Sequence, residues 1–183
     1  FLQISQYFGI LDGIIVSTIV SNIRDDYKIL INKKISIIDH IKEYLFPIKF
    51  GNKKEDVIFN ISSKNKSINH LKNGGCLITF PSGEVATSKF IFDQPNERKW
   101  KPLIGSIIKK SEPKIIPVKF FGQNSKLFQF VGFFNNNLRR ALFIRELLNK
   151  KNETFEVQIE KSIENLNIKD LSNREISDNL KKL

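Results

Sequence analysis

The fold of this chain is decided by the stretch Gly-Gly-Cys-Leu-Ile-Thr-Phe-Pro-Ser-Gly-Glu-Val-Ala-Thr-Ser, residues 74–88. Residues 76–80 form a short apolar run between a glycine pair and a proline, which predicts a buried strand of a parallel sheet. Because proline cannot donate to a sheet ladder, Pro81 marks the carboxyl end of that strand. Gly83 then allows a tight turn or a close approach to a ligand. Ligands of open α/β sheets bind beyond the carboxyl ends of the strands, so we expect this loop to carry the chemistry.

Predicted strands and helices alternate along the rest of the chain. Further strands are expected over residues 1–5, 27–31, 47–50, 114–121 and 154–159, and helices over residues 13–20, 33–45, 56–72, 100–110 and 137–150. Asp12 is expected to cap the first helix. Pro117 indicates an edge or a bulge in its strand, and the polar tail from Glu164 predicts a helix that docks weakly.

These elements indicate one domain over residues 1–183, because the length suits a single core and no repeat or low-complexity linker divides the chain. Alternation of strands and helices predicts an α/β fold, with a mixed, mostly parallel central sheet flanked by helices. The sequence begins at Phe1 and contains no methionine, so we expect a further segment to precede it.

The chain is strongly basic, with 30 Lys and Arg against 19 Asp and Glu and a net charge of +11. Such an excess favours an anionic partner, namely a phospholipid surface, a phosphorylated cofactor or a nucleic acid. Lysine-rich codon usage is an alternative origin of the same excess. The sequence contains no zinc-ligand pattern, recognition helix or aromatic-rich binding strand, so we expect neither a nucleic-acid partner nor a bound metal.

A single cysteine, Cys76, lies within the predicted buried strand. A lone buried cysteine cannot staple a secreted fold, which favours a reducing, cytoplasmic compartment. The sequence shows neither a secretory signal pattern nor an apolar run long enough to span a bilayer. The two histidines, His40 and His70, are interpreted as ordinary residues of helix surfaces.

Short motifs are spread in order over most of the chain. They are Phe8-Gly9-Ile10-Leu11-Asp12-Gly13, Leu45-Phe46-Pro47-Ile48, Gly74-Gly75, Phe80-Pro81-Ser82-Gly83-Glu84-Val85, Trp100, Ile116-Pro117-Val118, Gly122-x-Asn124-Ser125, Leu138-Arg139 and the run 145–150. This set resembles the glycerolipid acyltransferase family. It is most similar to the hemolysin-like bacterial branch, which includes lyso-ornithine-lipid acyltransferases. The resemblance implies an acyltransferase-like α/β fold.

The resemblance also implies a reaction, the transfer of an acyl chain from a thioester to the hydroxyl of a lyso-lipid. In the family, a motif histidine accepts the hydroxyl proton and a nearby aspartate fixes its tautomer. Asp12 matches the aspartate, whereas Gln6 and Tyr7 stand where the histidine is expected. Glutamine can orient a hydroxyl group but cannot act as a general base near neutral pH. The catalytic candidates are therefore Asp12, Gln6 and Tyr7.

Substrate contacts are expected from the same motifs. The candidates are Phe8, Gly9, Phe80, Pro81, Ser82, Gly83, Glu84, Trp100, Asn124 and Ser125. The commoner family form carries an arginine after the motif glycine, which grips an acceptor phosphate. Glu84 stands in its place here, which suits a lipid with a cationic head group. The basic helix with Arg139, Arg140 and Arg145 suits contact with anionic lipid.

The partners implied are a lyso-lipid acceptor, an acyl donor and an anionic membrane surface. The co-substrate is acyl-coenzyme A or acyl-acyl-carrier-protein, with no bound cofactor, and the location is peripheral on the cytoplasmic face of the inner membrane. A relative that has lost catalysis with the motif histidine is the alternative. Such a protein would keep the lipid groove and act in lipid binding or regulation.

Overall fold

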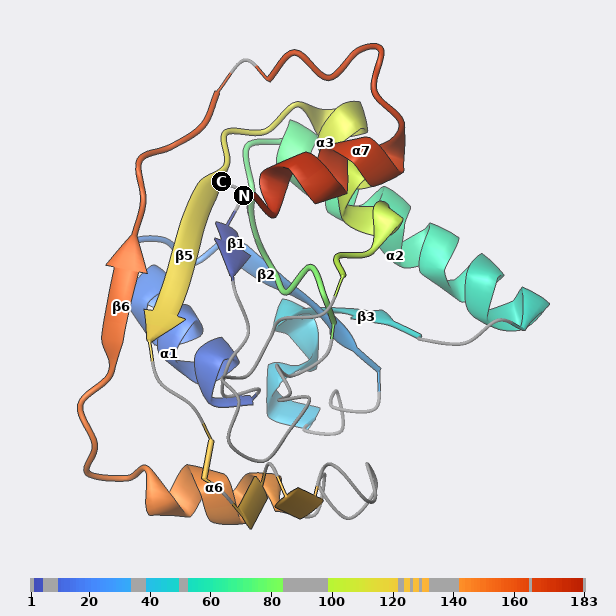
Figure 1. Ribbon diagram of the computed structural model, residues 1–183. Helices are drawn as coiled ribbons and strands as arrows, with labels where there is room; N and C mark the ends of the chain where they lie inside the picture. Colours follow the sequence, from blue (N-terminus) through green and yellow to red (C-terminus); the bar gives the residue numbers. More distant parts are fainter. Residues whose placement is uncertain are drawn as a thin grey trace.

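The structure is a computed structural model that describes residues 2–4, 10–33, 39–49, 53–83, 99–121, 124–125, 127–128, 130–131, 142–164 and 166–182. Its centre is a six-stranded sheet in the order β3-β2-β4-β1-β5-β6 (Figure 1). The strands are β1 (Leu2–Ile4), β2 (Tyr27–Asn32), β3 (Leu45–Ile48), β4 (Cys76–Thr79), β5 (Ile116–Phe121) and β6 (Glu156–Ile159). The first five pair in parallel, and β6 runs antiparallel to β5. The predicted mixed, mostly parallel sheet is confirmed.

Helices cover both faces of this sheet (Figure 1). They are α1 (Ile10–Ser21), the 3₁₀ helix η1 (Asp39–Tyr44), α2 (Lys54–Lys72), α3 (Pro102–Ser111), α6 (Phe143–Asn149) and α7 (Asn173–Leu180). One face packs against α1, and the opposite face packs against α2, α3 and α7. Helix α6 lies past the carboxyl end of β5 and contacts α1 (Figure 1).

Strand β4 joins the two apolar clusters. All four of its residues are buried, as expected of a central parallel strand. Leu77 packs with α2, α3 and α7, while Cys76 and Ile78 pack on the α1 side, because successive side chains of a strand point to opposite faces. Strand β4 is entered through Gly74, whose φ of 82° closes α2 with a Schellman motif. In that motif the backbone N–H of Gly75 donates to His70 O at 2.9 Å.

Two predictions for the N-terminal part were wrong. Asp12 does not cap α1, because the helix begins at Ile10 and the aspartate is in its first turn. The helix predicted over residues 33–45 is, in its described part, the 3₁₀ helix η1, and Leu45 already belongs to β3. The physical reason is pairing: Leu45 registers with Ile29 in the sheet.

Pro117 does not lie in an edge strand, since β5 has β1 on one side and β6 on the other. The carbonyl of Pro117 accepts the N–H of Glu160 at 2.9 Å, so the backbone of this residue faces β6. Strand β6 ends at Ile159, one residue before that contact. The missing N–H of the proline therefore falls at the end of the antiparallel ladder, where it removes one bond only.

The polar tail also docks more firmly than predicted. Helix α7 buries Ile176, Ser177 and Leu180 against α3. A capping box at Ser172 and Glu175 begins the helix. The Ser177 hydroxyl accepts the Gly105 N–H at 3.1 Å, so small residues on both helices allow a close approach. The small residues at this contact therefore let α7 dock closely on α3, although few residues of the tail are apolar.

The contact between α3 and α7 gives a stability prediction. A methyl group at Gly105 would overlap the backbone carbonyl of Asn173, which cannot rotate away as a side chain could. We expect Gly105→Ala to lower the free energy of unfolding by about 1–3 kcal/mol, although alanine is the better helix former. Urea denaturation measures the loss. Lys110→Ala, at an exposed position of the same helix, is the control and should be near neutral; equal values for both variants would contradict the tight contact.

Candidate functional site

The topology predicts a crevice at the carboxyl ends of β4 and β1. The two strands are neighbours, yet β1 leads to α1 on one face of the sheet and β4 leads to α3 on the other. Where adjacent strands send their connections to opposite faces, the connections diverge and leave a crevice, the usual ligand site of α/β sheets. The motif residues after both strands are thereby brought to one place.

Asp12 lies on the β1 side of this crevice. It is in the first turn of α1 and its side chain is 0% exposed. The partial positive charge of a helix N-terminus stabilises a carboxylate at this position. The next residue, Gly13, faces the β4 side: a Cβ built there would be 3.7 Å from Cζ of Phe80. The first turn of α1 therefore packs on the aromatic ring that begins the β4 loop.

The β4 side is a tight turn over residues 80–83. The N–H of Gly83 donates to the Phe80 carbonyl at 2.9 Å, and Gly83 has a φ of 66°, which favours glycine. Pro81 and Ser82 are buried within the turn. The Pro81 carbonyl accepts the N–H of Lys101 at 2.9 Å, which ties the turn to the start of α3. Strand β4 ends just before this turn, as Pro81 predicted.

The loop after β5 adds Asn124 and Ser125 at the same edge of the sheet. Asn124 is buried, and Ser125 is held by Glu146 of α6. The Ser125 N–H donates to Glu146 Oε2 at 2.8 Å and its hydroxyl donates to Oε1. The same hydroxyl accepts the Phe128 N–H at 3.2 Å. Helix α6 also contacts α1, so Glu146 links the β5 loop to the helix that carries Asp12.

Glu146 belongs to the motif run 145–150, and the sequence predicted no role for this residue. It is only 4% exposed, and burial of a carboxylate is costly unless donors satisfy it. Two donors from Ser125 do so here. The signal in the sequence was an acidic residue between basic and apolar neighbours of a helix, which suggests a buried polar contact. Sequence alone gives no partner for it.

Five predicted site residues lie outside the described part of the chain. They are Gln6, Tyr7, Phe8, Gly9 and Glu84, and their roles stay predictions. Trp100 is described, and it is buried in the apolar cluster under α2 and α3. It is one residue before Lys101, which binds the turn at Pro81. Its role in substrate binding also stays a prediction.

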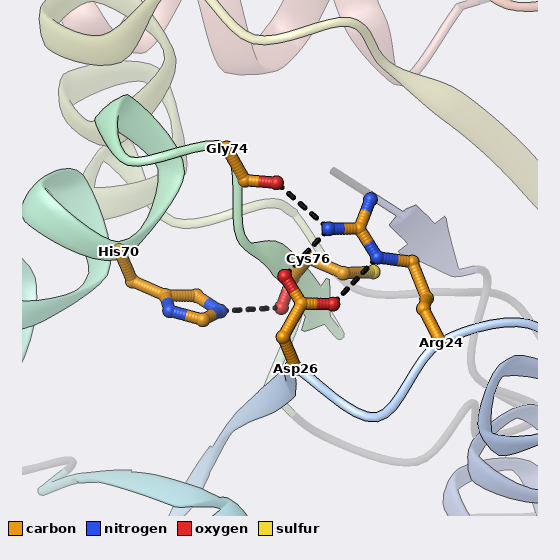
Figure 2. A network of polar contacts seen from close by, with 5 residues as sticks. All are labelled: Arg24, Asp26, His70, Gly74 and Cys76. Atoms are coloured by element: carbon orange, nitrogen blue, oxygen red, sulfur yellow. Dashed lines mark hydrogen bonds and ion pairs between the residues drawn. The ribbon is translucent and has the colours of Figure 1, made fainter.

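A polar network lies at the opposite end of the sheet, where β2 and β4 begin (Figure 2). Arg24 forms an ion pair with Asp26 at 2.6 Å and donates to Gly74 O at 2.7 Å. The hydrogen bond from Arg24 lowers the pKa of the Asp26 carboxyl. His70 donates through Nε2 to Cys76 O at 3.0 Å. This network fixes the entrance of β4.

Cys76 and His70 therefore both have structural roles at that end of the sheet. Burial raises the pKa of the Cys76 thiol, which disfavours the reactive thiolate. The ring of His70 occupies the space beside Gly75 and meets Phe46 edge-on. In the described ranges, no three His, Cys, Asp or Glu side chains are grouped so as to hold a metal ion. None of the helices described there has the length and apolarity needed to cross a bilayer.

Comparison with known proteins agrees with this architecture. No protein-family model matches the chain, and no curated protein matches it in sequence. The chain is similar in structure to a solved protein, the 1-acyl-sn-glycerophosphate (LPA) acyltransferase PlsC from Thermotoga maritima, with a TM-score of 0.53. The chain has the fold of an acyltransferase. The two sequences are 12% identical, and the similarity covers 100% of this chain and 64% of PlsC, so the chain spans less than two thirds of that protein.

The contact between Ser125 and buried Glu146 gives a testable prediction. We expect Glu146→Ala to lower the free energy of unfolding by about 1–3 kcal/mol, because it leaves the part-buried N–H and hydroxyl of Ser125 without their acceptor. Glu153→Ala is the matched control, since Glu153 is more than half exposed in an ion pair with Lys150, and it should cost less than about 0.5 kcal/mol. Urea denaturation compares the two. Similar small losses would mean that Glu146 does not hold the β5 loop.

Proposed function

We propose that this protein transfers an acyl chain from an acyl thioester to the hydroxyl of a lyso-lipid. The observation that carries the proposal is that, within an acyltransferase fold, the first turn of α1, which contains buried Asp12, packs on Phe80 at the start of the β4 turn. The structural neighbour is by name an enzyme that acylates 1-acyl-sn-glycerophosphate. Of the motif residues that the structure describes, Asp12, Gly13 and residues 80–83 lie at the carboxyl edge of β1 and β4, and Asn124 and Ser125 follow β5 at the same edge.

The reaction requires the protein to orient the two substrates and to transfer a proton. The lipid hydroxyl oxygen attacks the thioester carbonyl, a C–O bond forms and the C–S bond breaks. The hydroxyl proton passes to a base and then to the leaving thiolate, so that an ester and a free thiol result. Asp12 orients the group that accepts the proton, and a base of this kind typically contributes about 10²–10⁴-fold in rate. Gln6 and Tyr7 occupy the sequence positions of that group.

The acceptor and donor are proposed from the sequence motifs. Glu84 in place of the phosphate-gripping pattern favours a lyso-lipid with a cationic head group, such as a lyso-ornithine lipid. The donor is acyl-coenzyme A or acyl-acyl-carrier-protein. The protein would work peripherally on the cytoplasmic face of the inner membrane, in the synthesis of membrane lipids.

Asp12→Asn tests the proposal. The substitution keeps the shape of the side chain but removes its charge, so we expect acyl transfer to a lyso-lipid to fall by about 10²-fold or more. Release of free thiol from acyl-coenzyme A, measured with and without the acceptor, reports the rate.

Asp25→Asn, at an exposed position after α1, makes the same chemical change and should leave the rate unchanged. Thermal melting of both variants separates loss of chemistry from loss of fold. A parent protein without thiol release above the blank would overturn the enzyme proposal in favour of a lipid-binding relative.

Restoring the motif histidine tests which group serves as base. If the parent lacks an efficient base, Gln6→His or Tyr7→His should raise the rate of acyl transfer by about 10²-fold or more, because imidazole titrates near neutral pH. The gain should disappear when Asp12→Asn is added, since the new imidazole depends on that carboxylate. An active parent that gains nothing from either histidine uses a different base.

A further inference from the structure

The N-terminal half of α2 carries an apolar surface that no other described element covers. Val57, Ile58 and Ile61 are 50%, 59% and 46% exposed. With Lys54 they follow the spacing i, i+3, i+4 and i+7, so they lie on one side of the helix. We call these three apolar residues the α2 patch.

The α2 patch lies in line with a buried apolar residue farther along the same helix, with Lys64 and Asn65 between them. Ile68 lies seven residues after Ile61, on the same side of the helix, and it is buried in the cluster beneath α3. The helix then runs on, toward its N-terminus, past the sheet, α3 and α7 (Figure 1). Apolar side chains that continue beyond their own core, side by side, mark an interaction surface more often than isolated exposed residues do.

Lysines outnumber acidic residues in this part of the chain. On and beside it the cations are Lys33, Lys49, Lys53, Lys54, Lys64 and Lys66, and the anions are Glu55 and Asp56. Lys33 and Lys49 hold their Nζ atoms 4.9 and 5.1 Å from the ring centroid of Phe59, on the side of the helix away from the α2 patch, where Asp56 is paired with Lys49 at 3.2 Å. Lys54 shares the side of the patch, and Lys53 and Lys64 flank it, so the net charge beside the apolar side chains is positive.

The α2 patch and the crevice lie along the same edge of the sheet. Strand β3 ends at Ile48 and leads into the N-terminus of α2, so this end of the helix is at the carboxyl edge of the parallel strands. Only β2 separates β3 from β4. With strands about 4.8 Å apart, the β3 end lies about 10 Å from the β4 turn across the sheet.

We propose that the α2 patch is the surface by which the protein docks on an anionic lipid bilayer. A few apolar side chains that enter the interface, flanked by lysines that meet anionic head groups, are the features of a helix that lies in a membrane surface. A second copy of the chain fits less well. Three half-exposed side chains fall far short of the roughly 800 Å² that each partner buries in a standard interface, and facing lysines would repel.

This inference deepens the proposed function, because docking here would bring the crevice to the membrane that holds its acceptor. Binding is nevertheless measured apart from catalysis. The full chain is sedimented with vesicles of phosphatidylcholine alone and with about 30% phosphatidylglycerol, in salt from about 0.05 to 0.5 M. We expect binding to the anionic vesicles, weakened by salt.

The decisive variant is Val57→Gln/Ile58→Gln/Ile61→Gln, since glutamine keeps helix propensity while removing apolar surface. It should bind anionic vesicles about tenfold more weakly or worse. Ile23→Gln/Ile159→Gln is the matched control: both residues are exposed apolar side chains at the opposite end of the strands, and this variant should bind like the parent. Circular dichroism checks that all three proteins are folded.

Three outcomes would overturn the docking surface. They are a parent that does not bind anionic vesicles, a triple variant that binds as well as the parent, and a parent dimer in solution that the triple variant alone abolishes. The last would assign the α2 patch to a second copy. Vesicle binding that depends on the patch, without thiol release, would overturn the proposed reaction and leave the docking surface standing.

Discussion

The parallel pairing of β1 with both of its neighbours is the constraint on which the site depends. This strand has three residues, and it lies between β4 and β5 in the sheet. Its position sets α1 against one face, with Asp12 in the first turn of the helix and Gly13 beside the ring of Phe80. If β1 were at the edge of the sheet, the β4 turn and the start of α1 would not meet. The geometry of the candidate site therefore depends on backbone hydrogen bonds made by very few residues.

Around that pairing, part-buried polar contacts hold the loops that follow β4 and β5. Pro81 O is bound by the Lys101 N–H, and Lys101 O in turn accepts the Ser177 hydroxyl at 3.1 Å. Glu146 does the same for the β5 loop through Ser125. Each loop is thus fixed by a group from a later part of the chain. Rigid placement of this kind is what an active site needs when orientation contributes much of the rate.

The sequence was sufficient for the parts of this structure that depend on local chemistry. The glycine pair, the apolar run and Pro81 predicted β4 and its end, because backbone restrictions of Gly and Pro act wherever those residues stand. The loop after β4 was predicted to carry the chemistry, since ligands of open α/β sheets bind beyond the carboxyl ends of the strands. In the part of the chain that the structure describes, the first turn of α1, which contains Asp12, packs on Phe80 at that edge.

Features that depend on distant partners could not be predicted. Leu45 was assigned to a helix by its spacing, but pairing with β2 draws it into the sheet. The tail was predicted to dock weakly, but Gly105 and Ser177 let α3 and α7 approach closely enough for Ile176 and Leu180 to be buried. Glu146 is buried because Ser125, 21 residues earlier, supplies two donors. Periodicity describes one element at a time and contains no information on such contacts.

The central place of β1 has a consequence for how the chain reaches this fold. Leu2 registers with Ile78 and with Ile116, so the middle of the sheet is built from segments more than seventy residues apart. Closing loops of that length costs conformational entropy before the strand pairs contribute any stabilising free energy. Folding therefore slows as contacting residues become more distant in sequence. The sheet is therefore expected to form from β2, β3 and β4 first, with β1 inserted late. Until that insertion, β4 presents an open edge to other chains.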